Sequence, residues 1–165
     1  MLPRVPVWPV LLVLAACSND PGKGPVEIKW DRDICNRCRM VVSDPHFAAQ
    51  IRHFPEGRRS RVESFDDIGC AVLWLDQQTF KDDPATEIWV ADYQTGDWID
   101  ARTATYVTQN TTPMEYGLGA QPGPGGMNFE RARSHVYDVE QRFNQHGVQL
   151  LERLKEKAEK REGVR

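Results

Sequence analysis

The residues best suited to chemistry in this chain are two cysteines and a methionine within one short motif, Cys35-Asn-Arg-Cys38-Arg-Met40. Thiolate and thioether sulfur are soft donors, which select Cu(I), zinc or iron–sulfur clusters over hard cations. Methionine is a ligand typical of copper, whereas zinc and iron–sulfur sites use mainly thiolate and imidazole. The motif therefore predicts a soft-metal site and favours copper. A structural disulfide, or a redox-active C-x-x-C pair followed by a core methionine, is the alternative.

Two further residues are candidate metal ligands. Met114 lies in a polar segment rich in Pro and Gly, residues 110–126, where burial of its side chain is harder to justify than a binding role. His46 is the histidine nearest to the cysteine pair and would add an imidazole. Cys70 lies between two small residues on an expected helix, and we interpret it as a small buried hydrophobic residue.

Residues 1–16 have the features of a signal peptide. A basic residue precedes an apolar run that is too short to span a membrane, and Leu14-Ala-Ala-Cys17 follows. This end resembles a bacterial lipobox, which implies cleavage before Cys17 and a lipid on its sulfur; an ordinary secretory peptide with a chance cysteine is the alternative. The residue after Cys17 is Ser rather than Asp, which favours the periplasmic, inner leaflet of the outer membrane. Residues 17–28 predict a flexible tether.

Export changes the meaning of the cysteine count. The sequence has 4 Cys, so a lipidated Cys17 leaves three thiols in an oxidising compartment. An odd number leaves at least one thiol unpaired, and a bound soft metal gives a free thiol a reason to persist. The net charge of −3 offers no basic surface for nucleic acid, so we expect no nucleic-acid partner.

The hydrophobic pattern predicts an α+β fold with a strand–strand–helix order that occurs twice. Period-two alternation indicates strands, and apolar residues three and four apart indicate helices. Gly147 is expected to end the second helix, a closing strand follows, and the last residues form a charged, solvated tail. The expected elements are strands 47–52 and 60–65, a helix from 68 capped by Asp66 and Asp67, strands 87–92 and 103–108, a helix 129–147 and a strand 148–151.

Several segments together resemble the NosL family. The resemblance covers most of residues 31–151 and is most specific in the Cys/Met motif and in Trp-Ile-Asp-Ala-Arg. The segments are Cys35-x-x-Cys38-x-Met40, Phe47-Ala-Ala-Gln-Ile51, Phe65-Asp-Asp-Ile-Gly-Cys70, Asp97-Trp-Ile-Asp-Ala-Arg102, Ala104-Thr-Tyr-Val107 and Pro113-Met114.

The resemblance implies a lipid-anchored periplasmic copper chaperone for the assembly of nitrous-oxide reductase, not an enzyme. It implies two small, similar ββαβ-type halves packed together after the tether. We place them at residues 29–84 and 85–151, with a charged tail at 152–165. The family pattern has Gly directly before the first Met and often after the second, where this chain has Arg39 and Glu115.

The resulting hypothesis is a Cu(I) chaperone that holds one cuprous ion on Cys35, Cys38 and a methionine, Met40 or Met114, with His46 as a further candidate. Its partner is a copper-accepting client enzyme or the maturation complex of that enzyme, and Cys17 attaches it to the membrane. The rival hypothesis is a periplasmic thiol–disulfide oxidoreductase that uses the C-x-x-C pair. Such sites usually lie at a helix N-terminus, whereas this pair precedes a β-prone Val-Val dipeptide.

Overall fold

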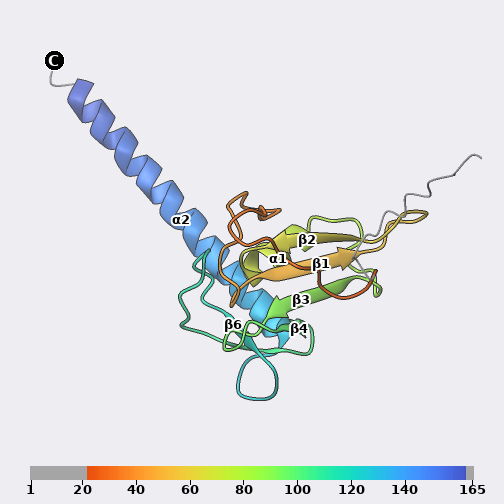
Figure 1. Ribbon diagram of the computed structural model, residues 1–165. Coiled ribbons are helices and arrows are strands. Elements are labelled where there is room, and N and C mark those ends of the chain that lie inside the picture. The colour runs from red at the N-terminus through yellow and green to blue at the C-terminus, as the bar shows by residue number, and fades with distance from the viewer. Residues whose placement is uncertain (1–21, 163–165) are drawn as a thin grey trace, which may run out of the picture.

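The computed structural model describes residues 22–162, so the expected signal peptide and Cys17 lie outside the described residues. The architecture is mixed α+β, as the sequence predicts, with antiparallel strands, a short helix and a long C-terminal helix (Figure 1). In chain order the elements are β1 (Ala49–His53), β2 (Arg61–Phe65), α1 (Ile68–Leu75), β3 (Glu87–Ala91), β4 (Trp98–Asp100), β5 (Thr105–Val107), β6 (Gly119–Gln121) and α2 (Phe129–Glu162).

The main sheet has four antiparallel strands in the order β2-β1-β3-β4. β1 is buried along its whole length, and Ile51 at its centre pairs with Glu63 of β2 and Ile88 of β3. β5 and β6 form a separate two-stranded sheet, which a parallel bridge between Asp92 and Ala120 connects to the end of β3. Since β1 and β3 pair across the expected boundary at residue 84, the two expected halves share one continuous sheet.

The core lies between the main sheet, α1 and the first turns of α2. α1 forms as expected, because its apolar residues recur at helical spacing and Asp67 caps it by accepting a hydrogen bond from the Gly69 N–H at 2.8 Å. The buried face of α2 begins with Phe129 and continues through Ala132, Val136 and Val139. No helix of the described part is long and apolar enough to cross a bilayer.

The C-terminal region differs from the expectation. α2 does not end at Gly147, which has no positive φ, and the expected strand at 148–151 is helical. Residues 148–162 are mostly strong helix formers, and one glycine within a helix costs only about 1 kcal/mol relative to alanine. The helix therefore continues to Glu162 and projects well beyond the sheet (Figure 1). β6 is a second difference, since it lies in the segment expected to be a loop.

The end of the expected tether is docked on the body. The Arg52 side chain, buried in β1, donates from Nε to the Gly24 carbonyl oxygen at 2.7 Å. Gln50 exchanges hydrogen bonds with the backbone of Val26, at 2.8 and 3.0 Å. The flexible stretch expected for 17–28 is therefore fixed against the sheet from Gly24 onward.

A candidate metal centre

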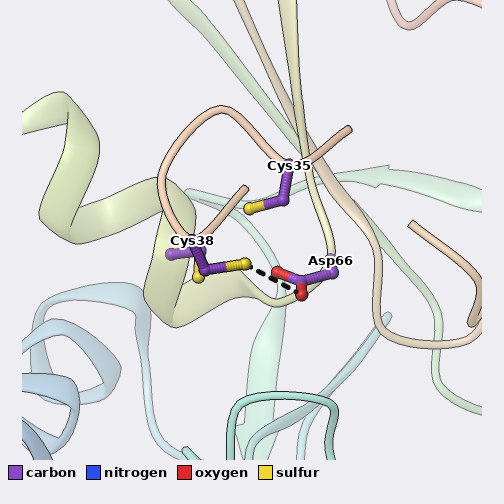
Figure 2. Close-up of side chains that lie close together, drawn as sticks. Cys35, Cys38 and Asp66 are labelled. Carbon is purple, nitrogen blue, oxygen red and sulfur yellow. Dashed lines mark hydrogen bonds between the residues drawn. The ribbon is translucent and has the colours of Figure 1, made fainter. Parts of the chain in front are cut away.

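Three thiols and one carboxylate converge beside the sheet. The sulfur atoms of Cys35, Cys38 and Cys70 and a carboxylate oxygen of Asp66 all lie within 4.8 Å of one another. Figure 2 shows the side chains of Cys35, Cys38 and Asp66 close together, with the Cys38 thiol directed at Asp66, where it donates to Oδ2 at 3.2 Å. Cys38 is half-buried and the other three residues are buried. We refer to these four residues as the thiol cluster.

Cys35 and Cys38 lie on a tight turn in residues 31–42, here called the metal loop. The Cys35 N–H donates to the Met40 carbonyl oxygen at 2.8 Å, and the Arg39 N–H donates to the Cys35 carbonyl oxygen at 3.1 Å. The Asn36 N–H donates to the Ser64 carbonyl oxygen at 2.9 Å, which fixes the loop to β2. The two thiols are therefore presented by a turn and not by a helix N-terminus.

Asp66 and Cys70 come from the junction between β2 and α1. β2 ends at Phe65, so Asp66 follows it directly, and Cys70 lies in the first turn of α1. Because the metal loop is attached to β2, both of its cysteines meet this junction. The cluster is thus built by two segments that the hairpin β1–β2 separates in the sequence.

The three thiols have different proton affinities. The Cys70 thiol donates a hydrogen bond to Cys35 and lowers the pKa of Cys35 to about 6, against the effect of burial. Holding this proton raises the pKa of Cys70, and burial adds to the effect. Burial raises the pKa of Cys38 to about 12. Near neutral pH the metal-free cluster therefore holds one thiolate and two thiols, and metal binding would release protons.

Asp66 has an oxygen that suits a cation. Its Oδ1 is buried and has no hydrogen-bond partner within the described residues, and the same holds for Oδ2 of Asp67. A buried acceptor without a partner costs roughly 1–3 kcal/mol, and native proteins usually explain such an atom by an ion or a water molecule. The donor set and this orphaned oxygen together fit a bound metal ion.

A comparison with family models identifies the chain. The model of the NosL family matches residues 25–138, which include the whole thiol cluster and Met114. The chain belongs to the NosL family. NosL proteins are copper-binding accessory proteins and are not a known enzyme family, so the family agrees with the soft donor set of the cluster. No curated protein matches the chain.

Only some of the predicted ligands of this NosL chain lie in the thiol cluster. Cys35 and Cys38 lie in the cluster. Met40 is 47% exposed, and its backbone N–H partly offsets the raised pKa of Cys38. Met114 is half-buried against the core, and its backbone N–H partly offsets the raised pKa of Asp67, next to the cluster.

His46 is engaged elsewhere. Its Nδ1 lies 3.1 Å from the carbonyl oxygen of Tyr93, and it does not belong to the thiol cluster. The structure therefore keeps both methionines near the cysteines but does not bring this imidazole to them.

The structure adds Cys70 and Asp66 to the site. Cys70 is buried, as expected, but its sulfur also faces the other two cysteines. Asp66 was expected to cap α1 with Asp67, whereas only Asp67 serves as the cap residue and Asp66 points into the cluster. The odd number of thiols in the sequence was the signal that could have placed Cys70 here.

Proposed function

We propose that this NosL protein carries Cu(I) on the thiol cluster and passes it to another protein. The observation that carries the proposal is the convergence of three free thiols on a buried carboxylate with an unpartnered oxygen. Three sulfur donors in one buried site favour a soft monovalent ion, and the neighbouring methionines would extend the same preference. The cuprous ion is cargo in this proposal, and no bond of a substrate is made or broken.

The graded burial of the cysteines supports transfer. Cys35 and Cys70 are buried, whereas Cys38 is half-buried and its thiol donates a hydrogen bond to Asp66. A partner's soft donor would approach on the side of Cys38 and exchange with it first, because the other thiols are shielded. Return of a proton from solvent to Cys38 would then lower the affinity of this sulfur for the departing ion.

The rival function, thiol–disulfide exchange, has one supporting observation: the pKa of Cys35 is lowered to about 6. An attacking thiolate must also be accessible. Here the thiolate is on the fully buried cysteine, and the more accessible Cys38 has a pKa raised to about 12. In a redox cysteine pair the accessible cysteine has the lowered pKa, and here the buried cysteine has it. We therefore prefer the copper proposal.

Metal competition tests the choice of cargo. Reduced full-length protein in detergent should bind one equivalent of Cu(I) under anaerobic conditions and should retain it against excess Zn(II). Cys35→Ser and Cys38→Ser should each abolish tight binding, whereas Ser43→Ala on an exposed position nearby should not. A site that takes Zn(II) in preference to Cu(I) would overturn the proposal.

We also propose that a lipid on Cys17 holds the protein in the periplasm, at the inner leaflet of the outer membrane. The client would be nitrous-oxide reductase or its maturation complex. The lipobox-like sequence and membership of the NosL family support this proposal. Cys17→Ser should move the protein from the membrane to the soluble fraction, and unchanged membrane association would contradict the anchor.

A further inference from the structure

A closed triangle of hydrogen bonds connects the metal loop to two distant segments. Arg37, which lies between the two cysteines of the motif, donates from Nη2 to Glu140 Oε1 of α2 at 2.7 Å and from Nη1 to the Tyr116 hydroxyl at 3.0 Å. Tyr116 in turn donates to Oε2 of Glu140 at 2.8 Å. Each of the three side chains therefore contacts the other two.

The triangle lies against the thiol cluster. Nη1 of Arg37 also lies 3.9 Å from the sulfur of Cys70. The Tyr116 ring covers the first turn of α1, where a Cβ on Gly69 would lie 2.2 Å from a ring carbon. Because Met114 is two residues before Tyr116, the same contact holds the Met114 segment beside the cluster.

The contact is partly shielded from water. Tyr116 is 1% exposed, and the side chains of Arg37 and Glu140 are 24% and 28% exposed. Charge-assisted hydrogen bonds in such settings contribute more than neutral ones. A planar guanidinium can hold two partners at once, whereas a lysine ammonium is a point charge on a flexible stem. The geometry therefore requires arginine specifically.

We propose that Arg37 is a positioning residue that latches the Met114 segment and α2 over the thiol cluster, and that opening of this latch limits metal release. The proposal rests on the proposed function, because it assumes that the cluster carries an ion. Because Arg37, Tyr116 and Glu140 supply no metal ligand in this proposal, loss of the latch should accelerate binding and release together. The equilibrium affinity should change little.

Transfer of Cu(I) to the chelator bathocuproine disulfonate tests this claim. In Arg37→Gln and Glu140→Gln the release rate should rise about 10- to 100-fold, which corresponds to the net loss of one such bond. The dissociation constant should stay within about threefold of wild type, because each 1.4 kcal/mol would change it tenfold. The double variant should release no faster than the faster single variant, since both changes break the same contact.

Matched variants separate the latch from the charge of the loop. Arg39→Gln removes a neighbouring exposed arginine and should leave the release rate unchanged. Arg37→Lys keeps the charge but not the two-pronged contact, and should release nearly as fast as Arg37→Gln. An unchanged release rate in Arg37→Gln would overturn the proposal. So would an affinity loss as large as the gain in rate, because Arg37 would then act on the bound ion itself.

Hydrogen exchange on the metal-free protein keeps this test independent of the copper proposal. Amides of residues 112–118 and of α2 near residue 140 should exchange faster in Arg37→Gln than in Arg39→Gln, while those of β1 should not change. This result would establish the latch even if the protein failed to bind Cu(I), which would refute only the proposed function. Equal exchange in both variants would refute the latch itself.

Discussion

Arg39 and Glu115 share the same left-handed backbone, with φ of +67° and +61°. Arg39 directly precedes Met40 and Glu115 directly follows Met114, so the two residues flank the two methionines near the thiol cluster. They are also the two positions at which the resemblance to the NosL family leads us to expect glycine. The left-handed conformation costs a residue with a Cβ roughly 1–2 kcal/mol, a cost that glycine avoids.

Glycine should therefore stabilise the chain at these two positions. Arg39→Gly and Glu115→Gly should each raise the free energy of unfolding by about 0.5–1 kcal/mol, because relief of the strain exceeds the added entropy of the unfolded chain. Urea denaturation of the metal-free protein measures this change. Arg32→Gly, at an exposed loop position without a positive φ, should instead be neutral or destabilising. Destabilisation by Arg39→Gly would show that the Arg39 side chain stabilises the fold by more than the backbone strain costs.

Cys70 should behave as a metal ligand. Cys70→Ser should reduce the Cu(I) affinity by more than the roughly 10- to 100-fold that loss of a supporting partner causes. His46→Ala is the matched control and should bind as wild type does, because His46 is held by Tyr93 away from the cluster. Competition with a chromogenic Cu(I) chelator gives both affinities. Full affinity in Cys70→Ser would exclude Cys70 as a ligand.

The thiols should titrate separately. Thiolate absorbance near 240 nm in the metal-free protein should show one group that ionises at about 6, below the ordinary cysteine value of 9.0. Cys35→Ser should remove this step. Cys70→Ala should move it to higher pH, because the hydrogen bond from Cys70 is the main cause of the low pKa of Cys35. A titration in which all thiols ionise near 9 would contradict this arrangement.

Stability of the metal-free protein should follow the same shifts. The lowered pKa of Cys35 gives stability that is fully present above about 9 and is lost as the pH falls toward about 6. The raised pKa of Cys38 gives stability that is fully present below about 9 and is lost as the pH rises toward about 12. Cys35→Ser should therefore flatten the rise in the free energy of unfolding between pH 6 and 9. If the free energy of unfolding of Cys35→Ser rose with pH as steeply as that of wild type, ionisation of Cys35 would not contribute to stability.

Met114 should contribute a weak ligand from the other side of the site. Met114→Ala should lower the Cu(I) affinity less than loss of any cysteine, because a thioether is a neutral donor. X-ray absorption of the Cu(I) form should show fewer sulfur neighbours than in wild type. Met127→Ala, directly after the same Pro/Gly-rich segment, is a suitable control. An identical copper–sulfur shell in the Met114 variant would exclude this residue as a ligand.

Strands and helices were predictable from the sequence where their own residues determine them. Two strands close to β1 and β2 were expected from period-two alternation, and α1 was expected from its apolar spacing and its Asp67 cap. β6 was not, because a three-residue strand depends on pairing with β5 and not on its own residues. The predicted end of α2 at Gly147 was wrong, because one glycine within a run of helix formers does not stop a helix.

The site was predictable only in part, for a similar reason. Cys35 and Cys38 are close in sequence, so their spacing alone indicates a shared ligand role. Cys70 reaches them only because Asn36 attaches the metal loop to β2 and the chain then turns directly into α1. No local pattern encodes this long-range contact. The exclusion of His46 likewise depends on its bond to Tyr93, far along the chain.

The split origin of the thiol cluster couples cargo loading to folding. An unfolded chain offers a metal only the short chelate of Cys35 and Cys38, because the β1–β2 hairpin must form before Asp66 and Cys70 join them. An ion that prefers the complete site binds the native state selectively, and at a concentration 100-fold above its dissociation constant it would stabilise that state by about 2.7 kcal/mol. Only a folded chain would then hold copper tightly. A partner that recognises the copper-loaded form would therefore not bind unfolded chains.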